Sequence, residues 1–312
     1  MRTTSAVAVL VACAACAGRP PAGNTATPAT PPAAVAARPA GPPPSASDPA
    51  AALPGVDLSG LTPEQARLVA EFALEEFCYC GCPHTLSECL RVHPGCRHAP
   101  RMARLAVRYA KAGATRADLG RMVTGYYASF DRRARLDVSG FGPPLGDADA
   151  PIALVEFSDF TCPFCQRFRP ALEEFVRAHA DRVKLFFKPF PIDSHPHAWE
   201  AAQAGEWARD HDLLWAMHDR LFEEAPALSV DELAGYARSV GGDPADLRKA
   251  IASGTYRPRI EGSREEARTA GIRGTPTLFM DGRMLSDLSG DGLEFTLEDE
   301  EEWRANHGWI RD

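Results

Sequence analysis

The 312-residue chain has no excess of basic residues. Its 34 lysines and arginines are outnumbered by 42 aspartates and glutamates, which gives a formal net charge of −8. Nucleic-acid-binding domains usually carry a basic patch or stripe, so the composition gives no support to nucleic-acid binding. The sequence also contains no internal repeat. Its length is sufficient for one or two globular domains, each with a hydrophobic core.

The sequence also lacks a hydrophobic run long enough to cross a bilayer, which takes about 20 apolar residues as a helix. The nearest candidate is residues 6–12 (AVAVLVA), which follow the basic Arg2. A short apolar run after a basic start is typical of the central region of a signal peptide. We therefore expect an exported chain, in a compartment that permits disulfide bonds.

The run ends in LVAC, residues 10–13. This resembles a bacterial lipobox, in which the cysteine becomes the lipid-modified first residue of the mature protein. The alternative is a plain secretory signal that is cleaved near Ala15 or Ala17. We expect residues 1–18 to be a signal peptide and lipidation region. Cys13 would then anchor the protein to a bacterial membrane, on the periplasmic side and preferably at the outer membrane.

Residues 19–57 contain few large apolar side chains. From Arg19 to Pro54 the chain consists mostly of Pro, Ala, Gly, Ser and Thr, and such a segment cannot bury a core. Extended at ~3.1 Å per residue, it would reach on the order of 100 Å. We expect a disordered tether, with order beginning near Leu58.

Capping signals and apolar stripes predict a small helical domain over residues 58–136. Thr62 and Pro63 begin one helix with Gln65 as a capping-box partner, and a second helix is expected over 101–112. A third follows Thr115, with apolar residues at three-four spacing that mark one buried face. These are Leu119, Met122, Val123, Tyr126, Tyr127 and Phe130.

Five of the nine cysteines lie between the first two of these helices: Cys78, Cys80, Cys82, Cys89 and Cys96. The C-x-C-x-C spacing and a Gly-Cys-Pro sequence favour a turn. One interpretation is two structural disulfides and a spare thiol, whose pairing the sequence does not reveal. A thiolate metal site, with His84 or His93, and a second redox site are the alternatives. We assign no metal here.

The same region resembles, more weakly, the periplasmic domain of CcmH-type cytochrome c maturation proteins. That domain is a three-helix bundle with a cysteine pair after the first helix, and residues 99–103 (APRMA) match the start of its second helix. The family has C-x-x-C, whereas this chain has C-x-C-x-C. The resemblance implies thiol reduction in cytochrome c maturation as one alternative function.

The second half of the chain alternates strand and helix signals. Residues 152–157 (IALVEF) read as a buried strand, and CPFC follows at 162–165. A helix, a strand at 182–188 and a long helical stretch at about 197–270 come next. Residues 275–280 (TPTLFM) then predict a last strand, with a hairpin turn at 281–283.

In this order, VEFSDFTCPFC, FPIDSHPHA and GIRGTPTLFMDGR resemble the DsbA-like branch of the thioredoxin fold over residues 147–285. We therefore predict an α/β thioredoxin fold with a helical insertion, preceded by a small all-α cysteine-rich domain. Residues 286–312 are expected to form an acidic, helical C-terminal tail. Its acidic run, 298–302, would lie on a solvated face.

The spacing of Cys162 and Cys165 suits a redox pair at a helix N-terminus. The free N–H groups and the positive end of the helix dipole stabilise a thiolate on the first cysteine. Cys162 is therefore expected to be the exposed nucleophile and Cys165 the covered cysteine that resolves a mixed disulfide. Pro163 occupies an early helical position, where no N–H is needed.

The resemblance implies three further site residues. Pro276, after Thr275, matches the cis-proline that faces the cysteines and offers backbone to a substrate strand. Glu156 matches a buried acid that relays a proton to the resolving cysteine. Lys188 is one candidate charge partner for it, and a solvent-facing Glu156 is the alternative. His195 and His197 are expected to orient a helix.

Phe164 stands where strongly oxidising members of this branch have a histidine. It can neither donate a hydrogen bond nor carry charge, so the disulfide should be a milder oxidant, with a Cys162 pKa between ~3.5 and ~8.5. We predict an enzyme that exchanges disulfides with exported cysteine-containing proteins, preferably as an oxidant, with an unidentified redox partner and no cofactor. A reductase or isomerase, or a non-enzymatic scaffold that binds clients, is the alternative.

Overall fold

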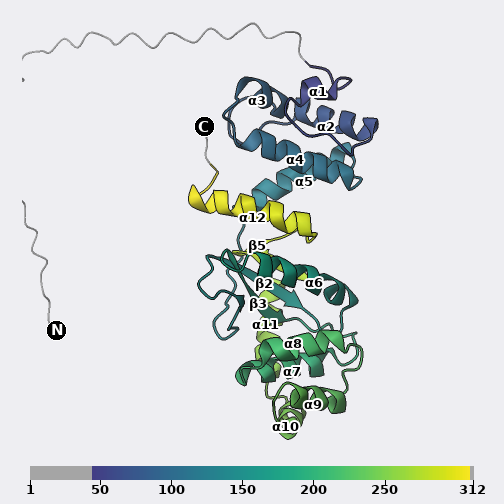
Figure 1. The fold of residues 1–312 in the computed structure, drawn as a ribbon, viewed down its shortest axis with the longest axis vertical. Helices are drawn as coiled ribbons and strands as arrows, with labels where there is room; N and C mark the ends of the chain where they lie inside the picture. The colour runs from purple at the N-terminus through teal and green to yellow at the C-terminus, as the bar shows by residue number, and fades with distance from the viewer. Residues whose placement is uncertain (1–43, 310–312) are drawn as a thin grey trace, which may run out of the picture. The chain divides into compact units, whose positions relative to one another are not determined.

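The computed structural model describes residues 44–309 (Figure 1). The predicted signal peptide, the lipidation site Cys13 and most of the predicted tether lie outside these residues. Within residues 44–309, no helix combines the length and the apolar character that a membrane crossing needs.

Five helices form the N-terminal part of the described chain. They are α1 (Pro49–Ala52), α2 (Pro63–Glu75), α3 (Leu86–Val92), α4 (His98–Lys111) and α5 (Arg116–Ser129). The capping boxes at Thr62 and Thr115 begin α2 and α5 as expected. The helices share one hydrophobic core, which includes Phe72, Leu105 and Tyr127.

Two features of this part differ from the expectation. Order begins before Leu58, because α1 lies within the range assigned to the tether and Leu53 is buried in the shared core. The segment between α2 and α4 also contains a helix, α3, in addition to the predicted turn. A capping box of Thr85 and Glu88 begins α3, so the sequence did carry a local signal for it.

A five-stranded sheet follows, in the order β1-β3-β2-β4-β5. The strands are β1 (Leu145–Gly146), β2 (Ile152–Ser158), β3 (Val183–Pro189), β4 (Thr277–Met280) and β5 (Arg283–Met284). The central pair, β2 and β3, is parallel and joined through α6 (Pro163–Ala178), whereas the other pairs are antiparallel. This is the predicted thioredoxin-like arrangement, in which α6 starts directly after the central strand.

Helices cover both faces of the sheet. On one face, Leu154 and Leu185 pack with Leu172 and Val176 of α6. On the other face, Val155 and Phe186 pack with Ala267 of α11 (Arg257–Thr269). Because successive side chains of a strand point to opposite faces, each residue of β2 belongs to one of these two layers.

The helical insertion between β3 and β4 has a core of its own. It contains α7 (Ala198–Asp210), α8 (Leu214–Glu223), α9 (Val230–Ser239), α10 (Pro244–Ser253) and α11. Trp207 is fully buried in its centre. The Ser229 capping box and the Asp243-Pro244 start form as expected.

The C-terminal segment is not a solvated tail. Residues 290–305 form the helix α12 (Gly290–Ala305), as expected, but Asp299 and Glu300 within the acidic run are fully buried. The Arg133 guanidinium lies 2.6 Å from Glu300, and Arg283 lies 3.4 Å from it. The prediction of a solvated acidic face was wrong, because the partly buried Arg133 and the buried Arg283 neutralise Glu300.

The helix α12 also joins the two parts of the described chain. Its residues Leu293 and Leu297 pack in the core between the sheet and α6, whereas Phe295 and Trp303 pack against the core of the N-terminal helices. The hydroxyl of Tyr126 on α5 donates to Asp299 at 2.7 Å. The segment expected as a separate tail is therefore part of the fold.

Candidate active site

Cys162 and Cys165 lie at the start of α6, directly after the central strand. Cys162 is the N-cap residue, Pro163 follows at the first helical position, and no side chain caps the helix. The first N–H groups of α6 therefore stay available to the Cys162 sulfur. We expected this sulfur to be exposed, but Cys162 is only 3% exposed, and its Sγ lies 3.5 Å from the Thr275 carbonyl oxygen.

The surroundings of Cys162 favour its thiolate. A hydrogen bond with the Cys165 thiol is the main cause, and it outweighs burial, which acts in the opposite direction. The Thr275 side chain and the backbone N–H groups of Cys165 and Phe164 add to the effect. Together they lower the Cys162 pKa from 9.0 to about 5, so this thiol is ionised at neutral pH.

Cys165 has the opposite character. It is fully buried, and its burial, the Cys162 thiolate and the carboxylate of Glu156 raise the Cys165 pKa far above its ordinary value. Only the first cysteine of the pair is therefore a ready nucleophile. The second needs a base to remove its proton before it can attack.

Glu156 is buried on the same face of the sheet as α6. It is 3% exposed, and its Oε1 atom has no hydrogen-bond partner among the described residues. Burial is the main cause that raises the Glu156 pKa to about 7, helped by Glu173 and opposed by Ser158. A carboxyl group with this pKa can both take and give a proton near neutral pH.

Lys188 is not the charge partner of Glu156. Along the parallel pair, Glu156 is opposite Phe187, and Lys188 is opposite Phe157 on the other face of the sheet. The Lys188 ammonium instead pairs with Glu266 of α11 and donates to the Asp137 carbonyl at 2.6 Å. The candidate pairing was wrong, because Glu156 and Lys188 point to opposite faces of the sheet.

Two residues that precede the CPFC motif, the acidic Asp159 and the polar Ser158, were not identified from the sequence. Asp159 accepts hydrogen bonds from the backbone N–H groups of Thr161 and Ile192, both within 3.0 Å, and lies 2.8 Å from His195 Nδ1. It thereby fixes the loop before Cys162 to the loop after β3. The D-x-T spacing is a turn signal that could have identified Asp159.

No sequence signal comparable to the D-x-T spacing at Asp159 could have identified Ser158. Its hydroxyl is buried, and it acts to lower the pKa values of both Glu156 and Cys165. The His195 side chain contacts Asp159 in the loop before Cys162, and its expected role in orienting a helix stays a prediction. His197 precedes α7 with a left-handed φ of 58° and makes no side-chain capping bond.

The Thr275–Pro276 peptide bond is cis. It leads into β4, which pairs with β2 in the register Phe157 to Thr277. This pairing brings the Thr275 carbonyl beside Cys162. The structure thus assembles Cys162, Cys165, Glu156, Thr275 and Pro276 from segments more than a hundred residues apart in the sequence.

A model described as Thioredoxin matches residues 140–299, slightly more than half of the chain. The chain belongs to the thioredoxin family. The match extends past the predicted limits of 147 and 285, and at its C-terminal end it includes most of α12.

Curated relatives match the chain over part of their length. Na(+)/H(+) antiporter NhaA 1 of Salinispora arenicola is 34% identical over 139 residues, which are 44% of this chain and 21% of that protein. Na(+)/H(+) antiporter NhaA 1 of Mycolicibacterium vanbaalenii is 36% identical over 143 residues, 44% of this chain and 23% of that protein. The chain therefore spans about a fifth of the length of these relatives.

Among solved structures, oxidised BdbD from Bacillus subtilis is similar to this chain with a TM-score of 0.51 and 24% identity. The alignment covers 55% of this chain and 97% of BdbD. This similarity supports the fold, and the prediction of a DsbA-like thioredoxin fold is confirmed. A thioredoxin-family site with a nucleophilic Cys162 and a buried Cys165 supports thiol-disulfide exchange.

Among residues 44–309, three groups of side chains outside this site could hold a metal ion. Glu173, His218 and Asp219 lie together, but Arg169 lies 3.1 Å from Glu173 and 3.3 Å from Asp219 and supplies the positive charge there. The other two groups overlap and contain the five cysteines of the N-terminal helices, one of them together with His84 and His93. These cysteines belong to the core of those helices, whereas Cys162 and Cys165 belong to the core of the helical insertion.

Proposed function

We propose that the protein is an exported, membrane-anchored thiol-disulfide oxidoreductase that acts on cysteine-containing exported proteins, with oxidation as its preferred direction. One observation carries the proposal. The Cys162 pKa is lowered to about 5 beside a Cys165 thiol whose pKa is raised, so the two cysteines are prepared for different steps of one exchange. Lipidation at Cys13 would hold the enzyme at the membrane.

In the oxidative direction, a substrate thiolate attacks Cys162 Sγ of the Cys162–Cys165 disulfide. The bond between the two enzyme sulfurs breaks, and Cys165 leaves with the electron pair and takes a proton, for which Glu156 is a buried acid close enough to act on the Cys165 thiol. A second substrate thiolate then attacks the substrate sulfur of the mixed disulfide. Cys162 leaves as a stable thiolate, the substrate has lost two electrons, and the enzyme has gained them.

Thr275 and Pro276 would bind the substrate backbone. The Thr275 carbonyl lies 3.5 Å from the Cys162 sulfur, which places a hydrogen-bond acceptor next to the reacting atom. An extended substrate segment that donates an N–H to this carbonyl would present its cysteine to Cys162. Phe164, at 63% exposure, offers an apolar contact beside this position.

The preference for oxidation follows from the stabilised thiolate. A reduced form that is stabilised makes the disulfide a better oxidant, and Phe164 limits this effect because it supplies no positive charge. Renewed cycles require an unidentified disulfide-bearing partner that reoxidises the enzyme. Reduction or isomerisation uses the same atoms in reverse.

The test is turnover with a protein substrate. The oxidised enzyme should form the disulfide of a reduced two-cysteine peptide stoichiometrically, and the reduced enzyme should accelerate insulin reduction by dithiothreitol. Cys162→Ser should abolish both, whereas Cys82→Ser, a matched change of a cysteine outside the site, should alter neither. An inactive wild-type protein, or full activity in Cys162→Ser, would favour a scaffold that only binds clients.

A further inference from the structure

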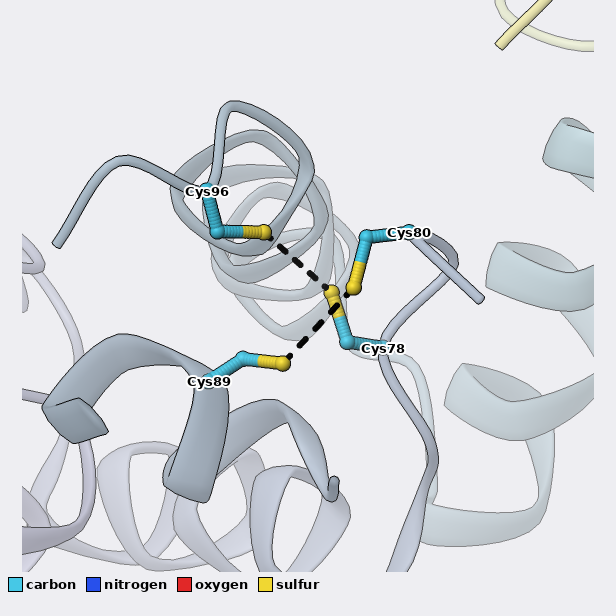
Figure 2. A group of neighbouring side chains, drawn as sticks. All are labelled: Cys78, Cys80, Cys89 and Cys96. Atoms are coloured by element: carbon cyan, nitrogen blue, oxygen red, sulfur yellow. Dashed lines mark hydrogen bonds between the residues drawn. The ribbon is translucent and has the colours of Figure 1, made fainter. Parts of the chain in front are cut away.

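Four buried cysteines of the N-terminal helices place their sulfur atoms in one small cluster (Figure 2). They are Cys78, Cys80, Cys89 and Cys96, and every pair of these sulfurs lies within 4.8 Å. Figure 2 shows the four side chains converging on one point from different segments of the chain. No residue of this group is more than 5% exposed.

The spacing of the sulfurs suits a tetrahedral ion. Zinc binds thiolate sulfur at about 2.3 Å, so two ligands of a regular tetrahedron lie about 3.8 Å apart. The Cys78 and Cys96 sulfurs are 3.8 Å apart, and so are the Cys80 and Cys89 sulfurs. These pairs are two opposite edges of the cluster and share no atom, so each supports the tetrahedral arrangement independently.

The backbone around the cluster is organised to present these side chains. An isolated bridge pairs Phe77 with Thr85, and the Cys78 N–H donates to the His84 carbonyl at 3.1 Å. This closes the loop that carries Cys78 and Cys80. The capping box at Thr85 then begins α3, which carries Cys89.

The fourth cysteine lies just before α4. The Cys96 sulfur accepts a hydrogen bond from the backbone N–H of Ala99 at 3.4 Å. Such N–H bonds orient a ligand sulfur and stabilise its negative charge. Each of the three segments therefore has a local structure that fixes the position of its cysteines.

A second set overlaps with the first. Cys82, His84, Cys89 and His93 also bring ligand atoms within 4.8 Å of one another. However, the Cys82 sulfur lies 2.9 Å from Cys89 and 3.0 Å from Cys80, well short of the tetrahedral edge of about 3.8 Å. Cys82 is also the one cysteine of the five that is partly exposed.

We propose that Cys78, Cys80, Cys89 and Cys96 bind one zinc ion as a closed four-thiolate site. The four thiols release their protons when the ion binds, and no electron is transferred. Four protein ligands leave no open coordination position, so the zinc is structural and holds the loop between α2 and α4. This site is separate from the redox pair Cys162–Cys165. If the protein does not bind zinc here, the proposed thiol-disulfide exchange is unaffected.

The experiment uses the full chain, purified in the absence of oxygen and of added thiol. Elemental analysis should find about one zinc per chain. Replacement by cobalt should give the intense visible bands and sulfur-to-metal charge-transfer bands of tetrahedral thiolate coordination. Cys78→Ser and Cys96→Ser should each lose the ion, and Cys82→Ser, the matched control in the same loop, should retain it.

Three results would overturn the proposal. One is a wild-type protein without bound zinc that also fails to take up cobalt. Another is a non-reducing peptide map of the isolated wild type with Cys78–Cys96 or Cys80–Cys89 disulfides. The third is zinc that is lost in Cys82→Ser and His93→Ala but retained in Cys78→Ser and Cys96→Ser. The first two measurements use only the wild type, so they decide the question even if a serine variant does not fold.

Discussion

The Glu156 carboxylate raises the pKa of the Cys165 thiol from within the same buried face of the sheet. Lys188 neutralises neither group, because its ammonium pairs with Glu266 on the opposite face of the sheet. The state in which Glu156 and Cys165 share one proton therefore has a lower free energy than the state in which both are charged. It also has a lower free energy than a buried Cys165 thiolate without a neighbouring acid.

Glu156→Gln should change how stability depends on pH. Burial raises the Glu156 pKa from 4.5 to about 7 in the folded protein, so the unfolded chain binds fewer protons between these values. The wild type therefore loses stability as pH rises from about 4.5 to about 7, by on the order of 3 kcal/mol, and the glutamine variant does not. Urea unfolding of both proteins at pH 4, 6 and 8 measures the difference.

The same variant should slow the step that uses Cys165. Mixed-disulfide resolution in the wild type should become faster as pH rises through about 7, where Glu156 becomes able to accept the Cys165 proton. In Glu156→Gln this rise should disappear, while the attack of Cys162 stays unchanged. An unaltered pH profile of resolution would remove Glu156 from the mechanism.

Titration of the reduced protein should give a thiolate midpoint at about pH 5. The ultraviolet absorbance of the thiolate reports it, and Cys162→Ser should lose this transition. The Cys162 pKa in the folded protein lies below its unfolded value of 9.0, so the thiolate stabilises the folded, reduced protein. This stabilisation is complete above about pH 9 and is lost as pH falls to about 5. A midpoint near 9 would contradict the account.

The residues that the sequence identified most directly are those with local signals. The strand before Cys162, the capping boxes at Thr62, Thr115 and Ser229, and the hairpin turn after β4 all depend on neighbours in the chain. Residues predicted through the family resemblance, such as Pro276, depend on a pattern that extends over a long stretch of sequence. Local signals and the family pattern can both be recognised in the sequence without knowing how the chain packs.

Phe164→His should make the disulfide more oxidising. Phe164 is 63% exposed, so the substitution should leave the fold intact, and a protonated histidine beside the Cys162 thiolate would stabilise the reduced form. We expect the reduction potential to rise by about 30 mV for each tenfold gain in the stability of the reduced form. Equilibration with glutathione buffers measures it, and Phe164→Tyr, which adds no charge, should leave the potential unchanged.

Glu300→Gln should destabilise the protein strongly. The Glu300 side chain is fully buried and pairs with Arg133 and with Arg283, which is itself buried. Loss of this charge leaves the arginines without their carboxylate and should cost about 3–5 kcal/mol in chemical denaturation. Glu301→Gln removes the adjacent, partly exposed pair with Arg182 and should cost less than about 1 kcal/mol. Equal effects of the two changes would contradict the buried network.

The features that the sequence did not reveal depend on distant contacts. The acidic run in α12 has the composition of a solvent-exposed surface. Its burial is stabilised by Arg133 and Arg283, which pair with Glu300 from distant parts of the sequence. The partner of Lys188 depends on which face of the sheet α11 covers. The convergence of Cys78, Cys80, Cys89 and Cys96 depends on three chain segments that a spacing pattern alone does not bring together.

The reduction potential of the Cys162–Cys165 couple tests the central claim most directly. The account predicts a single two-electron couple between the values of about −270 mV for thioredoxin and about −120 mV for DsbA. The couple should be absent from Cys162→Ser and Cys165→Ala, and unchanged in Cys82→Ser. A wild-type protein in which these two cysteines form no reversible disulfide, or one whose potential lies outside this interval, would contradict it.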